Sequence, residues 1–160
     1  METKSVIETR ELTKVCNSRP AVDKLSLAIT EGESFGFLGP NGAGKTTSLL
    51  MLLGLTQPTS GTAKVLGLDP SREPIKVKSK IGYLQENMGF YSDLDARQML
   101  RFIAELNGFS GHQADERIDA ALEAVGLADE AAKKISAYSR GMRQRLGLAE
   151  LLIKDSQVAF

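Results

Sequence analysis

Apolar and polar residues alternate along the first part of the chain in a pattern that predicts strands. The alternation covers Val6–Val15 and Ala21–Ile29, and the polar stretch Asn17–Pro20 between them predicts a turn. A short apolar run, Ser34–Leu38, predicts a further strand. The apolar residues of Leu49–Leu55 follow a glycine-rich loop, and this order predicts a strand–loop–helix unit.

Strands and helices continue to alternate up to residue 85. Pro58 and Gly61 bracket a predicted turn, after which Thr62–Leu66 predicts a strand. Pro74–Lys80 predicts a basic helix, and Ile81–Leu84 predicts a return to strand. Such an alternation is typical of an α/β core.

Beyond Glu86 the spacing of apolar residues becomes that of helices. Ser92, with Asp95 three residues later, predicts a capping box at the start of a first helix, and Gly108 predicts its end. A second helix ends at Gly126 and carries an apolar stripe at i, i+3, i+4 and i+7, formed by Ile118, Ala121, Leu122 and Val125.

These patterns predict an α/β chain with three parts. Residues 1–85 form the N-terminal part of the α/β core, which contains the glycine-rich loop. Residues 86–150 form an inserted helical subdomain, in which a third helix is predicted from Ser139 to Ile153. Residues 151–160 return toward the core, where the apolar run Gln157–Phe160 predicts the beginning of another strand.

Composition and charge narrow the classes of function. The 160 residues include 20 basic and 20 acidic side chains, so no net charge favours nucleic acid or anionic lipid as a partner. The apolar stretches fall short of the ~20 residues that span a bilayer, and the N-terminus lacks the pattern of a secretory signal. The single cysteine fits a reducing cytoplasm. We therefore expect a cytoplasmic protein that lies beside any membrane it serves.

A phosphate-binding loop is the most specific motif in the chain. The pattern G-x-x-x-x-G-K-[ST] is matched in full, and extended by one threonine, by Gly39-Pro40-Asn41-Gly42-Ala43-Gly44-Lys45-Thr46-Thr47. Glycines allow successive backbone N–H groups to turn toward phosphate oxygens, and the start of the following helix adds its positive dipole end. The motif predicts that Lys45 reaches the β- and γ-phosphates and that Thr46 binds Mg²⁺. The alternative, a chance glycine-rich turn, does not explain the strand–loop–helix setting.

The loop and its surroundings resemble the ATP-binding subunit of ABC transporters. The resemblance includes Leu53-Gly54-Leu55 and Pro58-Thr59-Ser60-Gly61, and it continues to Phe160. A second stretch, Tyr138–Leu146, is similar to the family signature Leu-Ser-Gly-Gly-Gln and looks like the branch that serves ABC-2-type exporters. The resemblance implies a P-loop NTPase (RecA-like) core with an antiparallel β subdomain and an inserted helical subdomain, and it implies ATP and Mg²⁺ as cofactors.

The signature stretch has a physical reading of its own. Ser139 is a good N-cap, and a helix N-terminus beside the backbone of Gly141 is a second site for an anion. The resemblance implies that two subunits pair head to tail, so that Ser139, Arg140 and Gly141 of one face the γ-phosphate held by Lys45 of the other. The alternative is that Ser139 only caps a surface helix. Arg140 replaces a glycine, and it either strengthens the phosphate contact or points away.

Two further positions depart from the family pattern. The family usually places an aromatic residue on the adenine, and the matching position here is Cys16. Because a thiol has no flat face, we expect weak base selectivity, with GTP binding comparable to ATP binding. The alternative for Cys16 is a small strand residue without a ligand.

The family's glutamine falls on Glu86, with Gln85 one place earlier. Either side chain is an oxygen donor that can help to hold Mg²⁺ or orient the attacking water. A solvated loop carboxylate is the alternative for Glu86.

The resemblance also implies residues that would follow Phe160. In the family, the strand predicted at 157–160 leads to the Walker B Asp, which orders Mg²⁺, and to a Glu, which activates water. We therefore expect this chain to be truncated just before that pair, with the C-terminal part of the core missing. The expected activity of the 160 residues is nucleotide binding with little or no hydrolysis.

The leading function is the ATP-binding subunit that couples ATP binding and hydrolysis to export by an ABC-type membrane transporter. Its expected partners are a second ATPase subunit, identical or different, and a polytopic membrane permease, which places it on the inner face of the cell membrane. A non-transport ABC ATPase acting on ribosomes or DNA is the alternative within the family. A P-loop kinase for a small substrate is a third class, but it leaves Ser139–Leu146 unexplained.

Overall fold

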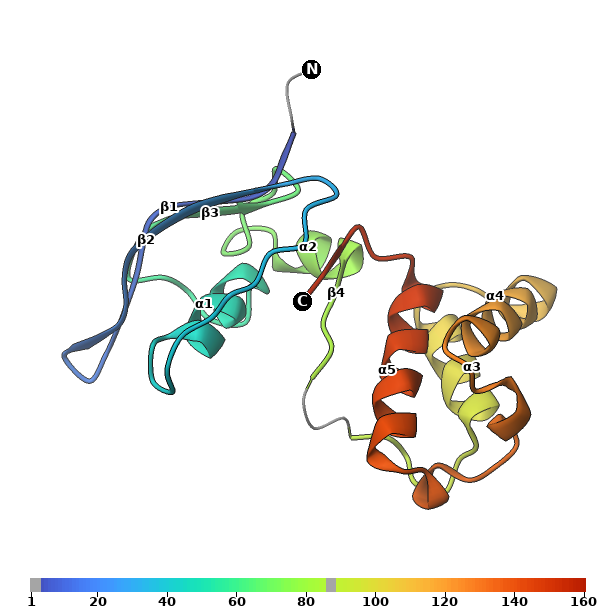
Figure 1. Ribbon diagram of the computed structural model, residues 1–160. Coiled ribbons are helices and arrows are strands. Elements are labelled where there is room, and N and C mark those ends of the chain that lie inside the picture. The colour runs from blue at the N-terminus through green and yellow to red at the C-terminus, as the bar shows by residue number, and fades with distance from the viewer. Residues whose placement is uncertain (1–3, 86–88) are drawn as a thin grey trace. The chain divides into compact units, whose positions relative to one another are not determined.

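The computed structural model describes residues 4–85 and 89–160. The chain divides into two compact units, one that ends at Lys80 and one that begins at Ile81. Figure 1 shows strands and two short helices in the first unit and a group of helices in the second.

An antiparallel sheet forms the centre of the first unit. Its strands β1 (Ser5–Cys16), β2 (Arg19–Thr30) and β3 (Ser60–Val65) lie in the order β2-β1-β3. The β1–β2 hairpin turns at Asn17 and Ser18, whose φ angles of 48° and 61° are both positive, as a tight hairpin turn requires. The strands predicted at Val6–Val15, Ala21–Ile29 and Thr62–Leu66, and the turn between the first two, are thereby confirmed within one or two residues.

Two helices complete the first unit. Helix α1 (Lys45–Leu52) follows the P-loop, and α2 (Pro74–Lys80) has the predicted bounds. The core of the first unit is apolar. Its buried residues come from the sheet and from both helices with their ends: Ile7, Leu12, Val22, Met51, Leu52, Leu53, Ala63, Val65 and Val77. Burying this apolar surface fixes the sheet against α1 and thereby the loop between them.

The second unit is a helical cluster with a small parallel sheet. The helices are α3 (Ala96–Leu106), α4 (Gly111–Ala124) and α5 (Arg140–Lys154), with short turns η1 (Ala128–Glu130) and η2 (Ile135–Ala137) before α5. Strands β4 (Ile81–Gly82) and β5 (Val158–Ala159) pair in parallel. The three predicted helices and the strand predicted at Gln157–Phe160 are therefore present.

Three local predictions are corrected by the structure. Ser34–Leu38 forms no strand: Leu38 is 92% exposed, and this apolar run is not part of the three-stranded sheet of the first unit. Strand β4 covers only Ile81–Gly82, which pair with Val158 and Ala159, although the Leu84 amide still donates to the Phe160 carbonyl oxygen at 2.8 Å. The capping box lies three residues later than predicted, since the Asp95 side chain accepts from the Gln98 amide while Gln98 reaches back to the Asp95 amide.

Candidate nucleotide-binding site

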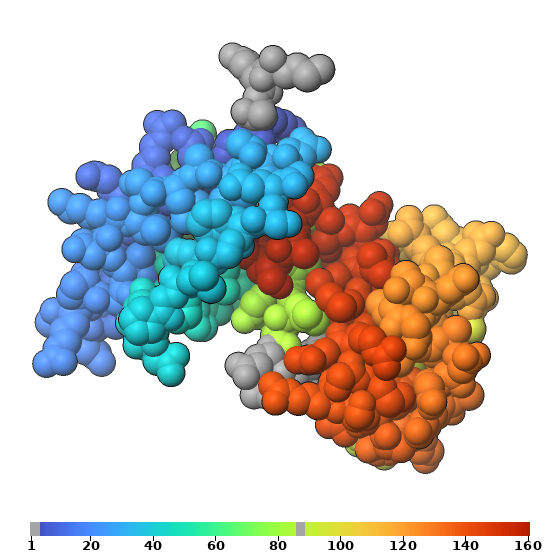
Figure 2. All heavy atoms as spheres, in the orientation of Figure 1, coloured from blue at the N-terminus to red at the C-terminus, as the bar shows by residue number. Residues whose placement is uncertain are grey.

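The P-loop connects the irregular segment before it to the start of α1. Gly42 and Gly44 adopt φ angles of 85° and 83°, in the left-handed region that other residues avoid. The loop lies largely at the surface, and Figure 2 shows this cyan stretch of the first unit exposed to solvent. A triphosphate tail therefore has access to the backbone of the loop.

The first turn of α1 provides backbone donors without acceptors of their own. Gly44 is the N-cap and contributes no side-chain cap, and the first intrahelical bond runs from the Ser48 amide to the Gly44 carbonyl oxygen at 2.8 Å. The amides of Lys45, Thr46 and Thr47 consequently have no partner within the helix. The first turn also carries no acidic side chain, so nothing there offsets the positive end of the helix dipole. This arrangement fits a polyphosphate.

Lys45 is folded over the loop that precedes it. Its Nζ donates to the carbonyl oxygens of Gly39 and Pro40 at 2.6 Å and 2.8 Å. The ammonium group is therefore held beside the loop backbone by two charge-assisted hydrogen bonds, where it can meet a bound anion without leaving the loop. Its half-buried position in the first turn of α1 limits the directions in which it can move.

Gly44 packs directly against the second strand of the hairpin. A Cβ placed on Gly44 would lie 2.1 Å from the Ala21 carbonyl oxygen and 3.0 Å from Val22 Cγ2. Beside this contact is a pocket of about 330 Å³ whose lining includes Pro20, Val22, Phe37 and Ala43. The pocket is adjacent to the loop and partly apolar, as a site for the base or sugar of a nucleotide would be. Sequence reasoning did not predict it, because the alternation in β2 shows which residues are buried but not what they contact.

Of the three residues predicted to bind Mg²⁺, the structure describes two, Thr46 and Gln85. Thr46 is exposed on the first turn of α1, so its hydroxyl is accessible to a metal that also binds phosphate oxygens. Gln85 is exposed after β4, and Glu86 lies outside the described residues. Among residues 4–85 and 89–160, no three His, Cys, Asp or Glu side chains gather into a metal site.

Ser139 is the N-cap of α5, as the sequence predicts. Its Oγ accepts a hydrogen bond of 3.2 Å from the Met142 amide. Ser139, Arg140 and Gly141 are all exposed, so the N-terminus of this fifteen-residue helix is open to a partner. Sequence reasoning did not predict how the preceding residue, Tyr138, is held: it is buried, and its hydroxyl donates to the Glu130 carbonyl oxygen. An aromatic residue directly before an N-cap was the available signal.

Cys16 lies at the tip of the β1–β2 hairpin, paired with Arg19. Its side chain is exposed. Strand β2 starts at this tip. Its residues Ala21 and Val22 lie against Gly44 and also line the pocket. The predicted position of Cys16 near a nucleotide base is thus compatible with the first unit, and its contact with a base stays a prediction.

The chain matches known proteins over most of its length. The ABC transporter family model matches residues 22–160. The chain is 42% identical over 149 residues to the bacitracin transport ATP-binding protein BcrA of Bacillus licheniformis, covering 93% of this chain and 48% of that protein. It is 39% identical over 156 residues to the probable multidrug ABC transporter ATP-binding protein YbhF of Escherichia coli (strain K12), covering 98% of this chain and 27% of that protein. The chain thus spans about half the length, or less, of these relatives.

Solved structures show the same fold. An ATP-binding subunit of an ABC transporter superposes with a TM-score of 0.84 at 21% identity, covering 96% of this chain and 64% of that one. The cbiO1 protein of Clostridium perfringens, part of the cbiONQ transporter complex, gives a TM-score of 0.86 at 22% identity, covering 97% and 64%. The predicted fold class, a P-loop NTPase with an antiparallel β subdomain and a helical subdomain, is confirmed. The chain belongs to the ABC transporter family, among its ATP-binding proteins.

Proposed function

We propose that this chain binds the triphosphate of ATP at Gly39–Thr47 and forms part of the ATPase that energises an ABC-type exporter. The arrangement of Lys45 carries the proposal: its ammonium group lies on the carbonyl oxygens of Gly39 and Pro40, at the start of a helix whose first amides have no intrahelical acceptor. A cation, free amides and a helix dipole converge on one loop, and this combination favours a multiply charged phosphate ligand.

Each loop residue has a role in the proposal. The backbone from Gly39 to Gly44 surrounds the phosphates, and the first amides of α1 donate to them. Lys45 neutralises the β- and γ-phosphates, and the Thr46 hydroxyl holds the Mg²⁺ that accompanies the nucleotide. The metal, when bound, would offset negative charge on the phosphates. Gln85 or Glu86 would add an oxygen ligand or orient water, as the family resemblance implies.

The second part of the proposal is a pair of subunits. A nucleotide held by Lys45 of one subunit would meet the exposed N-terminus of α5, with Ser139, Arg140 and Gly141, on another. The oriented amides and the Ser139 hydroxyl of such a terminus suit a γ-phosphate. Whether the second subunit is identical or different is left to experiment.

The membrane partner is proposed from relatives and from one surface. BcrA and YbhF are named for transport, and cbiO1 for a multi-component transporter. No helix among the described residues is both long enough and apolar enough to cross a bilayer. In the second unit, Tyr91 and Phe102 are exposed and stack edge to face, with ring centroids 6.0 Å apart. We propose that this aromatic pair helps to contact a polytopic permease at the inner face of the membrane.

Hydrolysis by the 160 residues alone is proposed to be slow or absent. The family resemblance assigns metal ordering and water activation to an Asp and a Glu beyond the strand at 157–160, and positioned water is what phosphoryl transfer to water requires. Phosphate release from MgATP by the purified 160-residue polypeptide, at more than one turnover, would contradict this part of the proposal. It would leave the proposed nucleotide binding untouched.

Removing the Lys45 ammonium group tests the site itself. Lys45→Ala is expected to weaken MgATP binding at least about tenfold, since it deletes the side-chain cation that donates to the loop carbonyl oxygens of Gly39 and Pro40. Lys64→Ala is the matched control, because Lys64 is an exposed lysine of the same unit on β3. Calorimetric titration with MgATP measures both. Equal affinities of Lys45→Ala and the wild type would refute the proposed function.

A further inference from the structure

Tyr138, the residue before the signature serine, is almost completely buried. Only 4% of its surface is exposed, and its hydroxyl donates a hydrogen bond of 2.7 Å to the carbonyl oxygen of Glu130. Burial raises the pKa of the phenol, and the carboxylates of Glu130 and Asp95 raise it further, so the hydroxyl stays protonated and can donate at neutral pH. The family signature that this stretch resembles has leucine here, which has no donor.

The hydrogen bond closes a short connection between two helical elements. Glu130 ends η1, and eight residues later Tyr138 directly precedes the N-cap of α5. Within this connection the Tyr138 amide donates to the Ile135 carbonyl oxygen at 3.0 Å, and Ile135 is itself buried. The backbone that leads into Ser139 is therefore held by residues buried in the helical cluster.

The same connection is also tied to the start of α3. The Ile135 amide donates to the Leu94 carbonyl oxygen at 2.9 Å, and the Ser136 amide donates to the Ser92 carbonyl oxygen at 3.0 Å. Together with the antiparallel bridge between Asp95 and Lys134, these bonds hold residues 134–136 in place. Tyr138 extends the fixed region by two residues, to the position that adjoins Ser139.

We propose that Tyr138 is a positioning residue for the signature serine: its hydroxyl anchors the backbone so that Ser139 and the first amides of α5 face the terminal phosphate bound to a second subunit. Ser139 is exposed, and its own cap bond to the Met142 amide is 3.2 Å long. An exposed hydroxyl that accepts this cap bond is oriented mainly by the backbone that carries it. Small displacements of such a group are costly when a reacting phosphate must be met. This inference rests on the proposed function.

Tyr138→Phe tests the anchor, because it deletes the hydroxyl and keeps the packed ring. The amides of Met142 and Arg143 bond to Ser139 Oγ and to the Ser139 carbonyl oxygen, so they report the cap directly. Their hydrogen exchange is expected to become about two- to tenfold faster in the variant, the factor that one hydrogen bond provides. Unchanged exchange at both amides would overturn the proposal.

Asn107→Ala is the matched control for a general loss of stability. The Asn107 side chain also donates one hydrogen bond to a backbone carbonyl oxygen, that of Ile103, but it lies after the end of α3 opposite the ties to residues 134–136. At 1.5 Å per residue, the eleven-residue α3 separates these two ends by roughly 16 Å. Asn107→Ala is expected to leave exchange at Met142 and Arg143 as in the wild type. A response equal to that of Tyr138→Phe would identify a merely structural effect and overturn the proposal.

The functional readout needs an ATPase-active polypeptide, in which these residues are accompanied by the Asp and the Glu that the family resemblance places after the strand at 157–160. In Tyr138→Phe, kcat for MgATP hydrolysis is expected to fall about two- to tenfold while the nucleotide affinity of the isolated subunit is unchanged, since Lys45 is untouched. A lowered affinity with unchanged kcat, or faster exchange with unchanged kcat, would overturn the role in positioning. Wild-type protein that does not bind MgATP would instead refute the proposed function, and that result is recognised before any variant is compared.

Discussion

The backbone of Gly44 in the P-loop lies against the carbonyl oxygen of Ala21 in β2, so closely that a Cβ on Gly44 would stand 2.1 Å from that oxygen. Gly44 also has a φ of 83°, which disfavours any residue with a side chain. Glycine is therefore required here twice, by conformation and by contact. The phosphate loop packs directly on the hairpin, so a substitution that disturbs this contact should lower both nucleotide affinity and the stability of the first unit.

Gly44→Ala is expected to weaken MgATP binding at least about tenfold and to destabilise the first unit. The added methyl group must displace either β2 or the loop, because the atom it meets is backbone and cannot rotate away. Gly32→Ala is the control: Gly32 has a similar φ of 79°, but nothing lies within 4 Å of its Cβ position. It should cost about 1 kcal/mol of stability and leave affinity unchanged. Calorimetric titration and urea unfolding separate the two; equal affinity losses in both variants would show that conformation alone decides.

Features specified by adjacent residues were predicted well from the sequence. The P-loop carries its own glycines, lysine and helix start, and α2 has its predicted bounds, Pro74–Lys80. The cap of α5 at Ser139 also follows from local chemistry, since a serine before an apolar-periodic run supplies an acceptor to the first turn. In each case the information lies within a few residues of the feature itself.

Features that depend on distant residues were not predicted. Ser34–Leu38 has the apolar character of a strand, but a strand also needs a neighbour, and none is hydrogen-bonded to it. Ser92 and Asp95 both resemble N-caps, and the reciprocal bond from Gln98 decides for Asp95. The contacts between Gly44 and Ala21 and between Tyr138 and Glu130 join residues that no periodicity relates. Folding, rather than local sequence, brings them together.

Cys16→Tyr is expected to strengthen MgATP binding by up to about tenfold. The hairpin tip that carries Cys16 is exposed and continues into the strand that lines the pocket beside the P-loop, so a flat ring there would gain a base to stack on. Cys16→Ser, which adds no flat face, is the control and should bind as the wild type does. Competition between ATP and GTP measures selectivity. A tyrosine variant with the wild-type affinity and the wild-type ATP-to-GTP ratio would place Cys16 away from the base.

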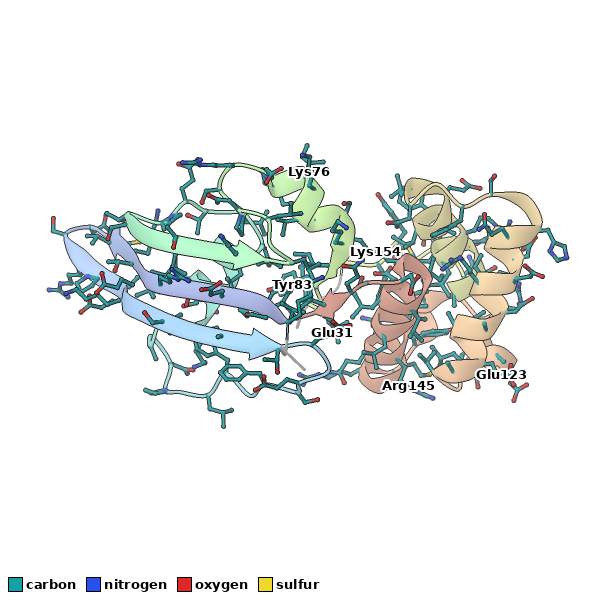
Figure 3. All side chains as sticks on the ribbon, turned by 90° about the horizontal axis from the view of Figure 1, so that it is seen from above. Glu31, Lys76, Tyr83, Glu123, Arg145 and Lys154 are labelled. Atoms are coloured by element: carbon teal, nitrogen blue, oxygen red, sulfur yellow. The ribbon has the colours of Figure 1, made fainter. Side chains whose placement is uncertain are left out.

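Arg145→Ala is expected to destabilise the second unit by about 1 kcal/mol. The Arg145 guanidinium extends from α5 (Figure 3) and its Nη1 donates to the carbonyl oxygens of Val125 and Gly126 at 3.2 Å and 2.9 Å, at the negative end of α4. Arg143→Ala is the control, because its bond to the Ser136 carbonyl oxygen is 3.5 Å long. Urea unfolding measures both variants. A loss for Arg143→Ala as large as that for Arg145→Ala would mean that the cap of α4 contributes nothing specific.

The opposite cap should act independently. Arg117 on α4 donates to the Ile153 carbonyl oxygen near the end of α5 at 3.2 Å, so each helix caps the other. Arg117 and Gly126 are nine positions apart along α4 and the residues after it, which corresponds to roughly 13 Å along a helix. Sites this far apart usually add, so Arg117→Ala and Arg145→Ala together should cost the sum of the two within about 0.5 kcal/mol. A double variant that loses much less stability than that sum would reveal one cooperative clamp, and one that loses much more would show that either cap suffices alone.

Glu150→Gln is expected to stabilise the protein above neutral pH and to have little effect in acid. Burial raises the pKa of the Glu150 carboxyl from 4.5 to about 7, and among the described residues its Oε1 has no hydrogen-bond partner. Between pH 4.5 and about 7 the folded protein keeps a proton that the unfolded chain has lost. The contribution of this group to stability is therefore full below pH 4.5, falls as the pH rises through that window, and is lost above about pH 7.

The gap between the two pKa values corresponds to at most about 3 kcal/mol, and partial exposure reduces the expected effect to about 1–3 kcal/mol. Glutamine does not titrate, so the stability of Glu150→Gln relative to the wild type should increase steadily from pH 4.5 to 7.5 in urea unfolding. Glu123→Gln removes an exposed carboxylate from α4 and should follow the wild type at every pH. A stability difference between Glu150→Gln and the wild type that stays constant with pH would mean that Glu150 is solvated in the folded protein. A difference that shrinks as the pH rises would mean that its charged form is stabilised there.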